Sequence, residues 1–366
     1  MQLIPILRAH KFPIETKLCH QNPPLLGSRP LKKHTFNSLM RRLSQAGFKT
    51  DFVRPALLPD WWDKACAEDP ALLPDVEIRV ARFLRLTLSA VQDPTIPLAP
   101  PHYEGAHLRR VRELDPSRLA PSIHTAIQVA SAVVRSLRSS MPPPTPLPAD
   151  GLLWREQIQH GADRAIGLSD LLGDLWERGI PVVPLDILPT PNFQGLACMV
   201  EGRPVVLLGH KHDEPGRVAF FIAHEVGHIA NRDCSPDNPI IDGEEEVSDD
   251  TPMERAADHY AMCVLVEDRV LPIVNANNYR ELATRAGEIE RADRIDAGAV
   301  IFAWARRTGN YQLAVMAVKA LYRAVGARRL LRTHFDRHVD LDSATESDRA
   351  LLHCVFGDPE CDATSR

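Results

Sequence analysis

The sequence predicts an α+β protein in which a small mixed sheet and one buried helix are flanked by helical regions. Up to about residue 140 the apolar residues recur with a helical period, as in DVEIRVARFLRLTLSAV at 75–91. After a proline-rich stretch the period changes, and two short apolar runs follow, LACMVEG (196–202) and RPVVLLG (203–209). With Gly202 at their junction, these runs predict a β-hairpin. From 276 to 338 the helical period returns.

The composition is that of a packed globular protein. The 366 residues are 44% hydrophobic and 25% charged, which leaves room for two or three domains. A net charge of -5 and a pI of about 6.3 argue against a chain that binds nucleic acid or membranes as a whole. The seven cysteines are scattered and form no CxxC pair, which favours reduced thiols in a cytosol. No apolar run reaches the roughly 18–20 residues of a membrane span, and no secretory signal is evident, so we expect a cytoplasmic protein.

The proline-rich stretch MPPPTPLPAD, residues 141–150, predicts a linker, because five prolines in ten residues cannot continue a helix. The predicted organisation is a mostly helical N-terminal region at 1–140, this linker, a motif-bearing domain at 151–272 and a helical C-terminal region at 273–366. Within the first region we expect helices at 34–47, 75–91 and 122–140, the last with Ser122 as N-cap. A further helix at 168–179 is expected to end at Gly179.

The N-terminal region is locally basic. Residues 1–50 carry nine Lys or Arg and one acidic residue, Glu15. ARFLRLTLSAV, at 81–91, weakly resembles a helix-turn-helix repressor segment. Two interpretations stay open: this region binds DNA, or it is a solvated basic tail beside ordinary surface helices.

The stretch FIAHEVGHIAN, at 221–231, carries the strongest chemical signal. On a helix His224 and His228 share one face, about 6 Å apart along the axis, and can bind one Zn²⁺. Glu225 lies about 100° around the helix, where it can take a proton from an attacking water without being a ligand. Gly227 lets another backbone come close. The metal, as far as the sequence goes, is Zn²⁺ or Mn²⁺.

Chance does not explain this spacing well. With 15 histidines in the chain, about 0.03 HExxH matches are expected. A buried helix with two histidines and a glutamate, but no metal, would also leave three polar groups in need of partners.

A third ligand is needed, and no third histidine follows His228 at the required spacing. Glu254 begins a later helix and is our predicted third ligand; Glu267 is too far along that helix, and acidic residues of the intervening loop are the competitors. Asp258, one turn after Glu254, is predicted to accept the free N–H of a ligand histidine. Ala257 and Ala261 keep the helix surface slim.

RVAFFIAHEVGHIA followed by MERAADHYA resembles the ImmA/IrrE family of bacterial metallopeptidases, which are gluzincins. The resemblance covers about residues 151–272 and departs from the family pattern at Phe221 and Tyr260. The matching positions are Arg217, Phe220, Ala223, His224, Glu225, Gly227, His228, Glu254, Ala257, Asp258 and Ala261.

The resemblance implies a zincin-like core and zinc-dependent endopeptidase activity, commonly against a DNA-binding helix-turn-helix repressor and in response to stress. His224, His228 and Glu254 would be the Zn²⁺ ligands, Glu225 the general base and then acid, and Asp258 the residue that orients a ligand. The alternative is a regulator or sensor in which the zinc domain docks a partner and the basic N-terminal region binds DNA.

Other features near the motif leave alternatives open. The loop between the two motifs, 234–252, carries seven acidic residues, which would steer a basic substrate or simply face solvent. The strand RPVVLLG would offer an edge to an extended substrate or be a purely structural edge. Tyr260 and His259 are the nearest candidates for stabilising the transition state. Cys234 is expected to be a small buried residue.

Overall fold

A five-stranded mixed sheet lies at the centre of the fold, with strand order β1-β5-β3-β4-β2. β3 pairs antiparallel with both of its neighbours, whereas β1 pairs parallel with β5 and β2 parallel with β4. The predicted α+β class with a small mixed sheet is thereby confirmed. The strands are β1 (His107–Arg109), β2 (Val182–Pro184), β3 (Phe193–Val200), β4 (Arg203–Leu208) and β5 (Ile240–Gly243).

The structure is a computed structural model. It describes residues 34–101, 107–109, 116–161, 164–209, 212–235, 239–243, 251–269, 276–321 and 326–356. All of these belong to one unit, His34–Arg366. Most of the predicted basic segment lies outside the described residues, as do all but one of the acidic residues between the two motifs.

The predicted hairpin is present as β3 and β4. Val200 pairs with Arg203, so only Glu201 and Gly202 form the turn. Both turn residues have positive φ, 52° and 79°. A two-residue turn of this kind matches the twist of antiparallel strands and favours glycine.

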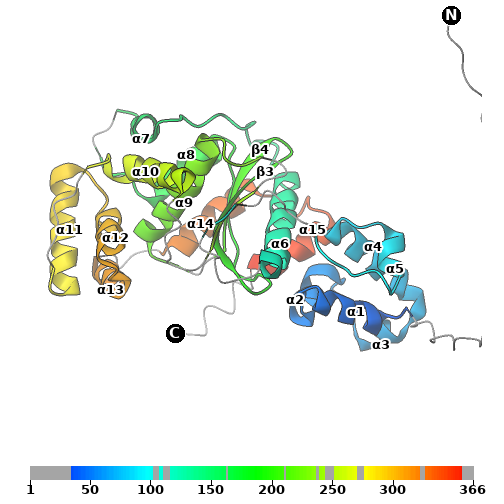
Figure 1. Cartoon of the computed structure of the whole chain (residues 1–366). Helices are drawn as coiled ribbons and strands as arrows, with labels where there is room; N and C mark the ends of the chain where they lie inside the picture. The colour runs from blue at the N-terminus through cyan, green and yellow to red at the C-terminus, as the bar shows by residue number, and fades with distance from the viewer. Residues whose placement is uncertain are drawn as a thin grey trace, which may run out of the picture. The chain divides into compact units, whose positions relative to one another are not determined.

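Helices cover both faces of the sheet (Figure 1). α6 (Pro116–Arg135) packs against β3 on one face, and α9 (Pro215–Ala230) packs against β3 on the other. α9 is in turn covered by α8 (Leu168–Glu177), α10 (Pro252–Val266) and α12 (Ala297–Thr308). The helix that carries the HExxH motif is therefore the buried centre of a helical layer.

The remaining helices lie before and after this core. α7 (Gly151–Gln159) lies between α6 and α8. The helices that precede β1 are α1 (Phe36–Gln45), α2 (Thr50–Leu57), α3 (Lys64–Glu68), the 3₁₀ turn η1 (Pro70–Leu72), α4 (Leu73–Leu84) and α5 (Leu88–Gln92). The C-terminal region is helical, as predicted, with α11 (Tyr279–Asp293), α13 (Tyr311–Leu321), α14 (Ala327–His338) and α15 (Glu346–Phe356).

Two local predictions in the N-terminal region are wrong. The helix expected at 75–91 is broken at Arg85, which adopts the left-handed conformation with φ 54° and ends α4. Thr87 then caps the short α5 by accepting from the N–H of Ala90. Ser122 is not an N-cap, because α6 already begins at Pro116, and proline is favoured in the first turn of a helix. Its hydroxyl instead donates to the carbonyl of Pro191 at 2.5 Å.

The proline-rich stretch at 141–150 contains no helix or strand, as predicted. It is nevertheless tied to the core: the Thr145 N–H donates to the carbonyl of Arg178 at 2.9 Å, and the Tyr260 hydroxyl donates to the carbonyl of Pro148 at 3.0 Å. The stretch thus runs along the elements that follow it. The proposed boundaries at 140, 150 and 272 stay predictions. Among the helices of the described residues, none combines the length and apolar character that a membrane crossing requires.

Candidate metal centre

Helix α9 holds the two histidines and Glu225 in a fully buried setting. Pro215 occupies its first turn, and Val218 and Ile222 are buried in the core on its inner side. His224, Glu225 and His228 are each 1% exposed. The prediction of a buried helix around this motif is confirmed.

Small residues allow α9 and α10 to cross closely. A Cβ added at Gly227 would lie 3.0 Å from Cα of Ala257 and 3.1 Å from its carbonyl oxygen, so only glycine fits without a shift. Thr251 caps α10 by accepting from the Glu254 N–H at 3.3 Å. Glu254 therefore enters the first turn of α10 facing the histidines of α9.

Three donor atoms converge where the two helices meet. The Nε2 atoms of His224 and His228 are 3.1 Å apart. Oε2 of Glu254 lies 3.3 Å from Nε2 of His224, and its Oε1 lies 3.6 Å from Nε2 of His228. A hydrogen bond between two facing ring nitrogens uses one proton only, whereas a single cation can accept a lone pair from each nitrogen and from the carboxylate. Two imidazoles and one carboxylate form a donor set that suits Zn²⁺.

Each histidine has a carboxylate behind it. Oδ1 of Asp258 lies 2.9 Å from Nδ1 of His224, which is the contact expected for a residue that orients this ring. Oδ2 of Asp233 lies 2.9 Å from Nδ1 of His228. Asp233 was missed by sequence reasoning. The chain turns back after α9 through Arg232, whose φ is 62°, and this turn returns Asp233 to the helix end.

Arg306 of α12 is a second residue that the sequence did not point to. Its guanidinium makes two hydrogen bonds to the carboxylate of Asp258, one from Nη1 to Oδ1 at 3.0 Å and one from Nη2 to Oδ2. Forty-eight residues separate this pair, so no local spacing relates them. The carboxylate of Asp258 thus joins His224 to the C-terminal helical region.

His224 and His228 are surrounded by negatively charged carboxylates. Burial alone would lower the pKa of His228, but the hydrogen bonds to Asp233 and Glu254, with the charge of Glu225, raise it to about 10. For Glu254 burial acts to raise the pKa, yet contacts with both histidines hold it well below the usual range. For Asp258 too, burial acts to raise the pKa, but contacts with His224 and Arg306 hold it well below the usual range. Buried negative charge of this kind attracts a cation.

Glu225 points toward the sheet side of α9. A Cβ added at Gly195, on β3, would overlap the Glu225 carboxylate, so glycine at this position makes the room that the carboxylate occupies. Glu225 does not belong to the three-residue donor group of His224, His228 and Glu254. It is placed beside the group without being part of it, as a general base must be. Gly195 could have been suspected only from its position on an apolar strand, where glycine often marks a close approach.

The other candidates near the motif lie elsewhere. Tyr260 is buried against Trp154 and its hydroxyl donates to Pro148, so it is directed away from the donor group. His259 has a side chain that is 62% exposed. Cys234 is buried, as expected. β4 lies between β3 and β2, so the prediction that RPVVLLG forms an edge is wrong, because a parallel partner that precedes the hairpin in sequence pairs with its outer side.

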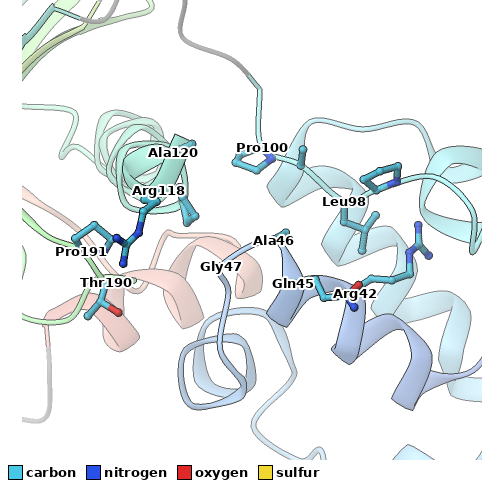
Figure 2. Close-up of a pocket in the computed structure, with 13 residues that line it drawn as sticks. Arg42, Gln45, Ala46, Gly47, Leu98, Pro100, Arg118, Ala120, Thr190 and Pro191 are labelled. Carbon is cyan, nitrogen blue, oxygen red and sulfur yellow. The ribbon is translucent and has the colours of Figure 1, made fainter. Parts of the chain in front are cut away.

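A cavity of about 480 Å³ lies away from this centre. Figure 2 shows its lining, which comes from the end of α1, the 97–100 segment, the start of α6 and the loop at Thr190–Pro191. Arg42 in its wall donates to the carbonyls of Val91, Ala90 and Ile96. Its guanidinium is therefore engaged in holding the fold, and none of the candidate site residues borders this cavity.

No family model, no curated protein and no solved structure matches the chain. Its function has to be inferred from the site itself.

Proposed function

We propose that this protein is a zinc-dependent endopeptidase. The observation that carries the proposal is the meeting of Nε2 of His224, Nε2 of His228 and the Glu254 carboxylate from two helices, with Glu225 next to the first histidine. Peptide hydrolysis by a metal needs such a three-residue donor set, which leaves a position for solvent, and a carboxylate that is not a ligand.

Each of these residues has a separate role in the proposed reaction. His224, His228 and Glu254 would hold a divalent ion, which would supply a Lewis acid to polarise a carbonyl and to make water a stronger nucleophile. Glu225, buried and seated against Gly195, accepts the proton of the attacking water and returns it to the leaving amine. Asp258 and Asp233 hold the Nδ1 side of each imidazole, which directs both Nε2 atoms to one point.

The finer assignment follows the sequence motifs. The resemblance of RVAFFIAHEVGHIA and MERAADHYA to the ImmA/IrrE metallopeptidases supports a zincin-like core and a protein substrate, with a DNA-binding repressor as the partner to test first. A location in the cytosol stays a prediction.

The test uses a proteome-derived peptide library with blocked amines, in which new N-termini are detected by mass spectrometry. We expect cleavage by the full chain, loss of cleavage with a chelator and recovery with Zn²⁺. Glu225→Gln should keep stoichiometric zinc and lose cleavage, whereas His228→Ala should lose both. Cleavage that persists in the Glu225→Gln protein would refute the mechanism.

The alternative is a regulator whose basic N-terminal region binds DNA. Its sequence signal lies mostly in residues outside the described part of the chain. DNA shifts by the full chain that weaken steeply with salt, together with an absence of cleavage in the library test, would favour it.

A further inference from the structure

A second group of metal-ligating side chains lies on α10, beyond Asp258. Sγ of Cys263 is 3.6 Å from Nε2 and 4.0 Å from Nδ1 of His259. Nδ1 of His259 is 3.5 Å from Oδ1 of Asp268. One donor atom from each of the three residues falls within 4.8 Å of the others.

The backbone brings these side chains together from both sides of the helix end. His259 and Cys263 are four residues apart and share one face of α10. Glu267 and Asp268 follow with φ of 57° and 52°, a turn that folds the chain back toward His259. Glu267 is fixed there by the buried Arg155, at 3.1 Å. Asp268 is thus held near His259 by the fold of the turn.

The distances are close to those around one tetrahedral ion. With Nδ1 of His259 as the ligand atom, the distances are 3.5 Å to Oδ1 of Asp268 and 4.0 Å to Sγ of Cys263. Bond lengths of about 2.3 Å to sulfur and about 2.0–2.1 Å to nitrogen or oxygen place the donor atoms about 3.4–3.6 Å apart. A thiol with an imidazole favours soft cations such as Zn²⁺ and Cd²⁺ over Mg²⁺ or Ca²⁺. The side chains of His259 and Asp268 are 62% and 56% exposed, so an ion can enter from solvent. We propose that Cys263, His259 and Asp268 bind a second, thiophilic divalent cation.

The test titrates Cd²⁺ into the chelator-stripped full chain and follows the ultraviolet charge-transfer absorption of a thiolate–cadmium bond. The first centre contains no sulfur donor, so it does not contribute to this absorption, and the Cys263→Ser variant separates the second site from the other six cysteines of the chain. We expect one equivalent in the wild-type chain, loss in Cys263→Ser and at least tenfold weaker binding in Asp268→Asn. Cys66→Ser, a change to a half-buried cysteine on α3, is the matched control and should leave the absorption intact.

The outcomes separate cleanly. No absorption in the wild-type chain, or absorption that survives Cys263→Ser, overturns the second site. Absorption that persists in His224→Ala supports a site independent of the proposed catalytic centre, and absorption lost in that variant overturns this independence. Circular dichroism melts check that each variant is folded, and Cys263→Ser changes a single atom, so the fold is expected to survive.

A different observation concerns Arg306 and rests on the proposed function. α12 is seated on the start of α9, where a Cβ at Gly216 would overlap the backbone of Gly298. Arg306 lies eight residues, or about two turns, further along α12. Its guanidinium lies 4.9 Å from the centre of the Phe220 ring and makes two hydrogen bonds to the carboxylate of Asp258. α12 therefore contacts α9 at two places, at Gly216 near the start of α9 and at Phe220, one turn before His224.

Oδ1 of Asp258 faces Nδ1 of His224 at 2.9 Å, and this contact depends on the orientation of the whole carboxylate. Arg306 holds one oxygen at 3.0 Å and binds the other, in the fork geometry that only an arginine offers. Its removal would leave Asp258 able to rotate away from the histidine, and outer partners of metal ligands typically contribute 10–100-fold to metal affinity. The geometry points to Arg306 as a positioning residue for the zinc ligand His224.

The test measures zinc affinity by competition with a chelating indicator, in a Cys263→Ser background that removes the second site and serves as the wild-type reference. Arg306→Gln should bind Zn²⁺ about tenfold more weakly, Arg306→Lys should be intermediate, and Arg307→Gln, a change to the neighbouring exposed arginine, should match the wild-type chain. If Arg306 acts through Asp258, the effect of Arg306→Gln should vanish in an Asp258→Asn background.

Each failure has its own signature. A wild-type chain that binds no zinc refutes the proposed function and this role together. Tight wild-type binding with equal affinity in Arg306→Gln and Arg307→Gln refutes the positioning role alone. Additive effects of Arg306→Gln and Asp258→Asn would also overturn it, because a merely structural arginine would act independently of Asp258.

Discussion

His124 on α6 and the pair His224–His228 on α9 are equally buried, yet their surroundings differ in charge. The ring of His124 packs edge-on against Phe83 at 5.2 Å, and its Nε2 lies 2.6 Å from the Phe83 carbonyl. Burial lowers the pKa of His124 to about 4, with only partial compensation by that hydrogen bond. For His228, contacts with carboxylates overcome the same burial effect and raise the pKa to about 10.

The difference separates a structural buried histidine from a candidate metal ligand. A backbone carbonyl satisfies one N–H and leaves a neutral ring, which is the structural solution at His124. Carboxylates placed on both sides of the ring make the second site one that attracts a cation, since Asp233 faces Nδ1 of His228 and Glu254 faces its Nε2. Burial alone therefore does not indicate a metal centre, whereas the partners of both ring nitrogens make His228 a candidate ligand.

Removal of a ligand should produce the largest contrast between the two regions. Zinc that binds the native chain at a concentration about 1,000 times Kd adds about 4 kcal/mol to the free energy of unfolding. In a Cys263→Ser background, which removes the second site, we expect this gain with no other change and in His124→Gln, and its absence in Glu254→Gln. Urea denaturation with and without Zn²⁺ measures it. An undiminished gain in Glu254→Gln would show that the ion binds elsewhere.

His124 should make the fold sensitive to acid. Its pKa is about 4 in the fold against an ordinary value of 6.5, so the unfolded chain takes up this proton first as the pH falls. The contribution is complete above pH 6.5 and is lost as the pH falls toward 4, at about 3 kcal/mol. Denaturation curves of His124→Gln should therefore depend less on pH across this window. Parallel curves for both proteins would contradict the prediction.

In the metal-free chain, the contribution of His228 to the free energy of unfolding changes with pH in the opposite direction to that of His124. Its pKa is raised from 6.5 to about 10, so its contribution is complete below pH 6.5 and is lost as the pH rises through about 10. The two histidine sites are thus expected to tilt the stability curve in opposite directions.

The sequence predicted those parts of the centre that follow from spacing along one helix. His224 and His228 share a face because they are four residues apart, and Glu254 and Asp258 do so on α10 for the same reason. Likewise the hairpin was predicted because its turn is local. Nothing in a helical period distinguishes His124 from a ligand, since the carbonyl that satisfies it belongs to Phe83 on another helix.

The contacts that complete the centre were missed because they are not local. Arg306 on α12 reaches Asp258 on α10, although α11 lies between these helices in the sequence, and Gly195 meets Glu225 from a strand. Asp233 is close in sequence, but only the left-handed turn at Arg232 shows that it returns to His228. The interior position of β4 depends on parallel pairing with β2, which precedes the hairpin in the chain.

Gly195→Ala should separate catalysis from metal binding. The added methyl group would displace the Glu225 carboxylate, and misplacement of a catalytic group by about 1 Å can reduce the rate about 100-fold. We expect kcat for library peptides to fall by that factor while zinc affinity stays within about twofold. Gly173→Ala on α8, where a Cβ meets nothing within 4 Å, is the control. Equal rates in both variants would remove Glu225 from the reaction.

Asp233→Asn should give the smallest effect, and one confined to the metal. The amide keeps the shape of the carboxylate but not its charge, so His228 loses the negative partner of its Nδ1. We expect zinc affinity to fall about tenfold, with little change in the rate at saturating Zn²⁺. Asp336→Asn, a change to an exposed aspartate on α14, should leave affinity unchanged. Asp233 lies on the turn that follows α9, whereas Arg306 lies on α12. A tenfold loss of zinc affinity in Asp233→Asn, in a chain that keeps Arg306, would show that the two histidines are oriented separately. His228 would be oriented by the adjacent turn, and His224 by Asp258 and Arg306.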